Sequence, residues 1–352
     1  MPIRPVNGME PLPVEGPHHV EALLERLVAA EHDPQLRRGL ADHLSFVAAV
    51  HPDWFRPYQE LAVTELPVLF DVTYGDLTTL LAEAPDQCVE ILAGRLRTHW
   101  NLQDSWMLAA IGTPAALAAV ADDVRAGADR RQYEDSGIWV PPTGPAQRRF
   151  VTQQWAVWVE PVEQGVDLTT ADHPVGLAVA DVVADPGNSP VTWHYLSITL
   201  GSVPGLPDWP ARQVHLVGPR ATWFWTLTSR IDTLGRYTDT VVELDDESDP
   251  VTEDSLCEQE EHGGGLAQAR LKPSDADLVY CNGHVLLTPG VMGTVGGPPI
   301  GLYPNPHCPD CGRLMFHIGT VRNQIREYGD GFRSLFLCED CHVVTSNATG
   351  WN

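Results

Sequence analysis

The sequence predicts an α+β protein, in which an N-terminal all-helical domain precedes a mostly antiparallel β domain that ends in a cysteine-rich hairpin. Three observations lead to this prediction. Apolar residues before about position 140 recur at helical spacing. From about position 150 the chain consists of short β-branched and aromatic segments separated by turn residues. Two Cys-x-x-Cys pairs then occur close to the end.

Changes in composition divide the chain into four segments. We expect an irregular leader at 1–17, a helical domain at 18–140, a β-rich domain at 148–295 and a four-cysteine tail at 296–352 that packs on the β-rich domain. A chain of 352 residues has room for this arrangement, because one domain usually takes ~100–200 residues.

The helical domain begins with two amphipathic helices. A second helix is expected to start at Pro34, because proline suits the first helical turn and Asp33 can cap it. Further helices are expected at 74–84, 86–100 and 101–127, the last one restarting at Pro114. The apolar faces of the first two helices are formed by Leu23, Leu24, Leu27, Val28, Leu36, Leu40, Leu44 and Val47.

The segment 105–124, "SWMLAAIGTPAALAAVADDV", resembles a helix, turn and helix of HEAT-like repeats. The chain shows no clear repeat of ~40 residues. An ordinary helical bundle is therefore an equal alternative to a HEAT-like array.

The β-rich domain is marked by short segments at 150–162, 191–201, 212–218, 222–229 and 240–248, which we expect to be strands. The acidic run 245–266 indicates a solvated loop. Two more strands are expected around a turn at Cys281, Asn282 and Gly283.

The paired cysteines are Cys308 and Cys311, followed by Cys338 and Cys341. Four thiolates satisfy zinc in a tetrahedron, so the spacing predicts one structural zinc ion per chain. Strands in "RLMFHIGTV" and "FRSLFL" place the two pairs at one end of a hairpin, which makes the tail a zinc ribbon. Gly312 can adopt the positive φ that such a turn requires, and His342 stands at the matching position of the second pair.

Other uses of these cysteines are less favoured. A thioredoxin-type redox site needs one pair at the start of a helix, and a closed shell of four thiolates leaves no position for a catalytic water. His307, His317 or His342 could replace one cysteine, although outer-shell or surface roles are preferred for them. Cys88, Cys257 and Cys281 are scattered, and we expect them to be buried or idle thiols.

The tail combines its two cysteine pairs with a Gly-Gly-x-Pro segment that precedes them. With these motifs it resembles the carboxy-terminal part of the YwqG-like bacterial proteins, a family without a well-defined activity. The resemblance covers about 60 of the 352 residues. It implies an architecture and a zinc site rather than a reaction, and it does not extend to the helical half. It rests on Gly296, Gly297, Pro299, Cys308, Cys311, Gly312, Met315, Phe316, Gly329, Asp330, Gly331, Phe336, Cys338 and Cys341.

Catalytic sequence motifs are absent, since no nucleophile elbow, metalloprotease, dinucleotide-binding or Walker pattern occurs. An enzyme or small-ligand binder remains the alternative, with a pocket in the aromatic β region and a purely structural zinc. The aromatic runs at 193–195 and 223–225 could line that pocket, although packing is the preferred reading for them. His194, His215, His262 and His284 could supply its chemistry.

The net charge of −25 is the strongest compositional signal. A chain this acidic repels phosphate backbones, so we expect no nucleic-acid partner. The arginines of the tail do not change this, because nearby Asp and Glu residues offset Arg313, Arg322, Arg326 and Arg333. The expected partner is another protein, and a basic one fits best.

Location follows from two further absences. No apolar run reaches the ~20 residues of a membrane span, and the first residues lack the apolar core of a signal peptide. We therefore expect a cytoplasmic, non-enzymatic zinc-binding protein that acts as a protein-interaction or regulatory module. One version is an immunity-type protein that neutralises a basic toxin or enzyme. The oligomeric state stays open.

Overall fold

The computed structural model describes the chain in two compact units. Unit 1 comprises Met1–Arg148 and Ser274–Pro289, and unit 2 comprises Arg149–Pro273 and Gly290–Asn352. The described residues are 16–30, 32–65, 77–78, 80–163, 166–219, 225–244, 267–273, 280–281, 285–286, 291–299, 304–325 and 331–350. The predicted turn at Cys281–Gly283 and the acidic run 245–266 lie outside them, except for Cys281.

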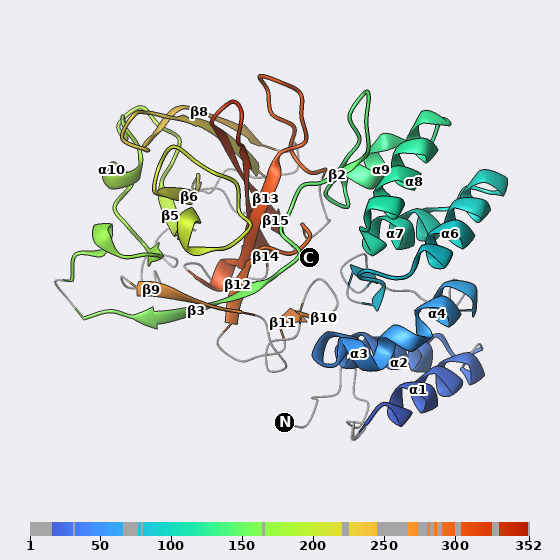
Figure 1. The fold of residues 1–352 in the computed structure, drawn as a ribbon. Helices are drawn as coiled ribbons and strands as arrows, with labels where there is room; N and C mark the ends of the chain where they lie inside the picture. The colour runs from blue at the N-terminus through green and yellow to red at the C-terminus, as the bar shows by residue number, and fades with distance from the viewer. Residues whose placement is uncertain are drawn as a thin grey trace. The chain divides into compact units, whose positions relative to one another are not determined.

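Unit 1 is mainly helical (Figure 1). Its helices are α1 (His18–Ala29), α2 (Pro34–Val50), α3 (Pro52–Phe55), η2 (Arg56–Tyr58), α4 (Gln59–Glu65), α6 (Asp86–Thr98), α7 (Leu102–Ile111), α8 (Pro114–Arg125) and α9 (Arg130–Glu134). Two short hairpins complete the unit, β1 (Ile138–Trp139) with β2 (Gln147–Arg148) and β10 (Tyr280–Cys281) with β11 (Val285–Leu286). No helix in the described part of the chain has the length and apolarity that a membrane span requires.

The predicted helix starts at Pro34 and Pro114 are confirmed, whereas the start of the helix predicted at 74–84 lies outside the described residues. Asp33 accepts a hydrogen bond from the Leu36 backbone N–H at 3.0 Å, and Pro34 occupies the first turn of α2. Thr113 caps α8 in the same way, with Pro114 as its first residue. Each cap satisfies a backbone N–H that has no partner within its own helix.

Unit 2 is a β domain built on one large sheet. The strands are β3 (Trp155–Pro161), β4 (Pro174–Val175), β5 (Trp193–Thr199), β6 (Gln213–Gly218), β7 (Trp225–Ile231), β8 (Tyr237–Leu244), β9 (Ala267–Pro273), β12 (Val291–Val295), β13 (Phe316–Arg322), β14 (Gly331–Cys338) and β15 (Val343–Gly350). Short helices α10 (Val179–Val182), η3 (Leu168–Thr170), η4 (Leu200–Ser202) and η5 (Asn323–Ile325) lie between them. The predicted α+β class is confirmed.

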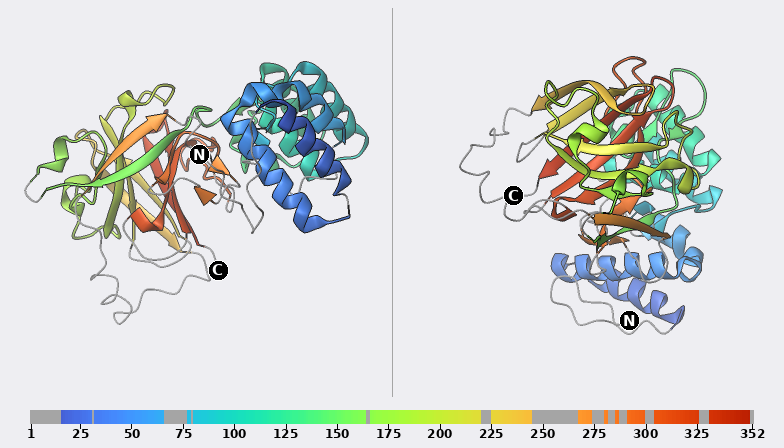
Figure 2. Two further views of the ribbon diagram at one scale, coloured as in Figure 1. Left: turned by 90° about the horizontal axis from the view of Figure 1, so that it is seen from below. Right: turned by 90° about the vertical axis from the view of Figure 1, so that its left-hand side faces the viewer.

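Among the described residues, the large sheet has nine strands in the order β4-β9-β3-β12-β13-β14-β15-β7-β8, and every neighbouring pair is antiparallel. The strands cross one another at an angle in the views of Figure 2, as the normal twist of a sheet requires. Strands β13, β14 and β15 lie in the interior of this order, so the C-terminal hairpin is part of the main sheet.

The hairpin of β5 and β6 covers one face of the sheet and encloses the core. Its β6 strand contacts β14 and β15, and buried side chains from both layers form one apolar cluster. Tyr195, Leu196 and Val217 contribute from the hairpin, and Leu335 and Val344 contribute from the sheet. This core fixes the ends of β13, β14 and β15, where the cysteines lie.

Candidate metal centre

Two tight turns carry the four cysteines. The first cysteine turn (residues 308–312) precedes β13, and the second cysteine turn (residues 338–342) connects β14 to β15. The Gly312 N–H donates to the Cys308 carbonyl at 2.8 Å, and the His342 N–H donates to the Cys338 carbonyl at 3.0 Å. Each turn is therefore closed by the same hydrogen bond, from its fifth residue to its first.

Both turns end in a left-handed residue. Gly312 has a φ of +69° and His342 has a φ of +55°. Glycine adopts this conformation without steric cost, and histidine is one of the few other residues enriched there. The expectation that these two positions would accept positive φ is confirmed.

The turns bring the four sulfur atoms into one cluster. All four Sγ atoms lie within 4.8 Å of one another, and Cys311 Sγ is 3.7 Å from Cys338 Sγ. A regular tetrahedron with Zn–S bonds of about 2.3 Å has S···S edges of about 3.8 Å. None of the four clustered cysteines forms a disulfide. The cluster thus has the size and the donor chemistry of a four-thiolate zinc site.

The four cysteines differ in their exposure to solvent. Cys308 and Cys338 are buried, Cys341 is half-buried and Cys311 is exposed. Burial raises the pKa of Cys338, and loss of hydration also raises that of Cys341 to about 11. Burial opposes ionisation of Cys311 as well, but hydrogen bonds from the Arg313 backbone and the other thiols outweigh it and lower its pKa. A divalent cation would favour the thiolate form of all four.

The nearby histidines have other contacts. In the described part of the chain, the ligand atoms of the cluster belong to cysteines alone. The buried His317 ring contacts the Gly297 carbonyl and Thr320 Oγ1, both at 3.0 Å. A carbonyl only accepts, so Nδ1 of His317 carries the proton and Nε2 accepts from Thr320. The His342 ring packs edge-on against Trp209. The backbone of His307 forms an isolated antiparallel β-bridge with that of Leu314.

Buried apolar side chains pack against the cysteines of the sulfur cluster. Met315, Phe336 and Val343 are buried and pack against Cys308 and Cys338. Each of the three lies on or beside a central strand of the sheet. The cysteine turns are therefore held by the domain core, and the low polarity under the cluster strengthens charge interactions there.

Three arginines pair with the carboxylates of the cysteine turns. Arg230 on β7 binds Asp310 of the first turn through two hydrogen bonds, of 2.7 and 2.6 Å. Arg149 binds Glu339 of the second turn. Arg313 binds Asp340, the residue that follows Glu339, at 2.6 Å. Each carboxylate beside the cysteines is thus neutralised by a cation from a different segment.

Arg149 also connects the two cysteine turns. Its Nε donates to the Leu314 carbonyl at 3.0 Å, next to the first turn, while its Nη atoms bind Glu339 in the second. Burial alone would raise the pKa of Glu339, but the Arg149 hydrogen bonds, a backbone hydrogen bond and the charges of Arg149 and Arg313 together lower it. The carboxylate therefore stays ionised and keeps both turns in place.

Two of the histidines considered from the sequence meet in the core. His194 Nε2 is 2.8 Å from Ser197 Oγ, which is 2.7 Å from His215 Nδ1. The Leu177 N–H donates to His194 Nδ1, so His194 Nε2 carries the proton and donates to Ser197, which donates to His215. Burial lowers the pKa of His215 to about 4. Ser197 is fully buried, so this chain of hydrogen bonds lies within the core.

The aromatic runs contribute mostly to packing. Tyr195 is fully buried, Trp225 is nearly so, and Trp193 packs against the same core. The cavity between β5, β6 and the sheet measures about 10 Å³, which is about the space of one water molecule.

Most of the remaining residues considered from the sequence lie outside the part of the chain that the structure describes. These are His262, His284, Trp223, Phe224 and Cys257. Cys88 is a buried thiol of unit 1.

Reasoning from the sequence missed Arg149, Arg230 and Trp209 at this site. No local signal marks them, because their partners are distant in the chain, by 190 residues for Arg149 and Glu339. It also missed β15, although the β-branched residues of "VVTSNATG" carry a recognisable strand signal.

Comparisons of the chain with known protein families, curated proteins and solved structures gave no match. The four-cysteine cluster is the part of the resemblance noted in the sequence that the structure supports. The structure itself shows a helical unit and a largely antiparallel β unit, and the β unit holds four clustered thiols.

Proposed function

We propose that Cys308, Cys311, Cys338 and Cys341 bind one structural zinc ion, as in the YwqG-like tail that the sequence resembles. The observation that carries this proposal is the gathering of four Sγ atoms within 4.8 Å. Four protein ligands complete the tetrahedron and leave no position for a catalytic water. The ion holds the ends of the central strands together and supports the β unit.

Elemental analysis of the full chain tests the zinc proposal. Protein purified from zinc-containing medium without chelator is expected to carry about one zinc per chain. Cys338→Ser is expected to lose most of it, whereas Cys88→Ser, which removes a buried thiol of unit 1, retains it. A folded wild-type protein that contains no zinc and takes none up on titration contradicts the proposal.

We further propose that the protein is a non-enzymatic, cytoplasmic interaction module that binds a basic protein, in the manner of an immunity protein. The net charge of −25 supports this, because it steers cationic surfaces toward the chain. The arginines beside the cysteines support it as well: Arg149, Arg230 and Arg313 are paired with carboxylates, so they offer little to a phosphate backbone.

Co-purification from the organism that carries the gene tests the interaction. Tagged full-length protein is expected to recover a basic protein that is released by raising the salt concentration, since exposed charge pairs are screened by salt. Recovery of no partner, together with a monomeric state at all concentrations, counts against the proposal.

A further inference from the structure

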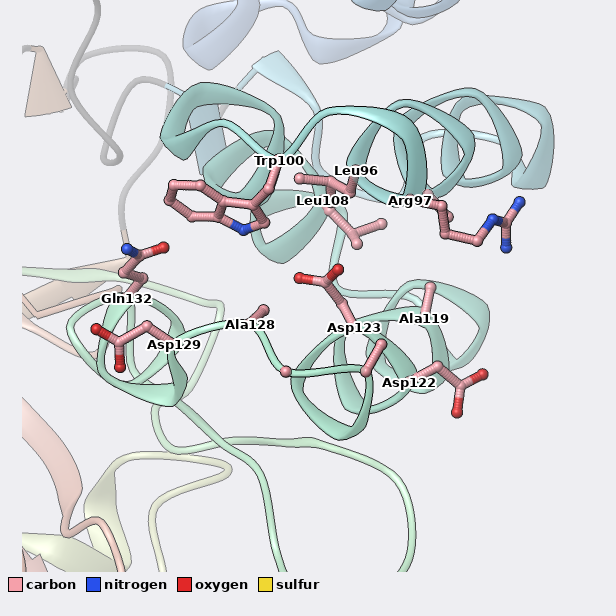
Figure 3. Close-up of a pocket in the computed structure, with 13 residues that line it drawn as sticks. Leu96, Arg97, Trp100, Leu108, Ala119, Asp122, Asp123, Ala128, Asp129 and Gln132 are labelled. Carbon is pink, nitrogen blue, oxygen red and sulfur yellow. The ribbon is translucent and has the colours of Figure 1, made fainter.

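Unit 1 contains a cleft of about 550 Å³, which we call the α6–α9 cleft. It lies between α6 and α7 on one side and α8 with the start of α9 on the other (Figure 3). Its apolar wall includes Leu96 and Leu108, both buried in the unit. The proposed function does not use this cleft.

An exposed aromatic ring borders the cleft. Trp100 follows the end of α6 and leaves 37 % of its surface accessible. Figure 3 shows its indole on the side opposite Asp129 and Gln132. A tryptophan this exposed beside an apolar hollow is a favourable face for a cation or a flat polar group.

Carboxylates border the other side of the cleft. Asp123 accepts a hydrogen bond from Tyr133 at 2.7 Å, and burial raises the pKa of Tyr133, so the phenol keeps the proton that it donates to Asp123. Asp129 caps α9 with one oxygen, Oδ1, which accepts from the Arg131 N–H at 3.0 Å. The second oxygen of Asp129 has no partner among the described residues.

A buried acceptor adds a separate indication of a ligand. Gln132 Oε1 is shielded from water and has no hydrogen-bond partner among the described residues. An acceptor left in this state costs free energy, and an N–H donor of a bound group recovers it once the Gln132 amide turns into the cleft. Of the cations nearby, Arg125 is paired with Asp122, and the side chain of Arg97 points away from the cleft centre in Figure 3.

We propose that the α6–α9 cleft binds an arginine-bearing segment of a protein partner. The apolar wall fits the aliphatic stem of arginine, and the Trp100 face fits its flat guanidinium. The carboxylates of Asp123 and Asp129 and the Gln132 acceptor fit its N–H donors. This inference rests on the proposed binding of a basic protein and names the surface that does it. An anion would meet two carboxylates, and a purely apolar ligand would leave Gln132 unsatisfied.

A short cationic peptide tests the cleft in the full chain. The probe is a rhodamine-labelled peptide of alternating glycine and arginine, compared with the same peptide carrying citrulline, which has the shape of arginine without its charge. Fluorescence anisotropy is expected to show saturable binding of the arginine peptide and at least tenfold weaker binding of the citrulline peptide.

Variants distinguish the cleft from the general acidity of the chain. Trp100→Leu keeps an apolar side chain but removes the aromatic face, and we expect about tenfold weaker binding. Asp123→Asn with Asp129→Asn keeps the acceptor for Tyr133 and the helix cap, and we expect a similar loss. The matched control, Glu21→Gln with Glu25→Gln, removes the same charge from the exposed side of α1 and is expected to bind within twofold of wild type.

The outcomes separate this inference from the proposed function. If the cleft variants and the control pair weaken binding of the arginine peptide equally, the cleft proposal is overturned. It is also overturned if Trp100→Leu leaves the affinity for this peptide unchanged. A partner that co-purifies equally with wild type and with the cleft variants overturns the cleft while the proposed function stands. Arginine-peptide binding that depends on Trp100, with no partner recovered from cells, supports the cleft and overturns the proposed partner.

Discussion

Arg149 and Glu339 lie 190 residues apart in the chain and form a two-pronged ion pair, with Nη1 2.8 Å from Oε1 and Nη2 2.7 Å from Oε2. The arginine side chain is 7 % exposed and the glutamate side chain 25 %. The pair joins the start of unit 2 to the second cysteine turn. Most of the strength of this contact comes from its fixed geometry and low exposure.

Removing one partner of this pair should destabilise the β unit. For Arg149→Ala we expect a loss of about 3 kcal/mol in the free energy of unfolding, because Glu339 is left partly buried without its counter-charge. Arg212→Ala is the matched control, since Arg212 pairs with Asp172 at an exposed position, where such pairs contribute about 0–1 kcal/mol. Urea unfolding of both variants measures the difference, and equal losses would contradict our assignment.

The left-handed turn residue should be sensitive to a single methyl group. At Gly312 no atom lies within 4 Å of the position that a Cβ would take, so Gly312→Ala tests backbone conformation alone. With a φ of +69°, we expect a loss of about 1–2 kcal/mol. Gly201 also has open space around a Cβ and no positive φ, so Gly201→Ala should be neutral or slightly stabilising. Similar thermal midpoints for the two variants would sink this explanation.

Metal removal should weaken the β unit more than the helical unit. A ligand that binds only the folded state stabilises it by mass action, so a strong chelator should lower the unfolding midpoint that is followed by near-ultraviolet circular dichroism. Zinc added back in excess is expected to restore it. The Cys338→Ser variant provides the control, because a chelator should leave its midpoint unchanged. If the chelator leaves the unfolding midpoint of the wild-type protein unchanged, this would argue against a structural ion.

The core histidines should make the protein sensitive to acid. Burial lowers the pKa of His215 from its usual 6.5 to about 4. Between pH 6.5 and pH 4 the His215 side chain is therefore protonated in the unfolded chain but neutral in the folded chain. Stability contributed by neutral His215 is therefore complete above pH 6.5 and falls as the pH drops toward 4, by up to about 3 kcal/mol. His173 acts in the same direction, because burial lowers its pKa too.

A variant at this position tests the origin of the acid sensitivity. His215→Asn keeps a polar partner for Ser197 but cannot be protonated, so its unfolding free energy should depend less on pH between 6.5 and 4 than that of wild type. The exposed His99 supplies the control, His99→Gln, whose pH profile should match wild type. Any pH dependence from the thiols is common to all three proteins and cancels in the comparison. Parallel profiles for His215→Asn and wild type would refute the assignment.

The sequence by itself determined the features that depend on near neighbours. The helix starts at Asp33 and Pro34 and at Pro114 follow from caps and ring geometry within a few residues. The positive φ at Gly312 and His342 follows from residue type and the Cys-x-x-Cys spacing. The four clustered thiols were predicted for the same reason, because each turn supplies two sulfurs locally and the hairpin brings the turns together.

Only the tertiary structure decided the contacts between distant segments. Arg149 reaches Glu339, Arg230 reaches Asp310, and Ser197 lies between His194 and His215 because the sheet order and the register of its strands place them there. The same order puts β14 in the interior of the sheet, and the packing of α6–α9 opens the cleft beside Trp100. Local propensity carries no information about pairings across many residues, since these depend on the burial of the whole core.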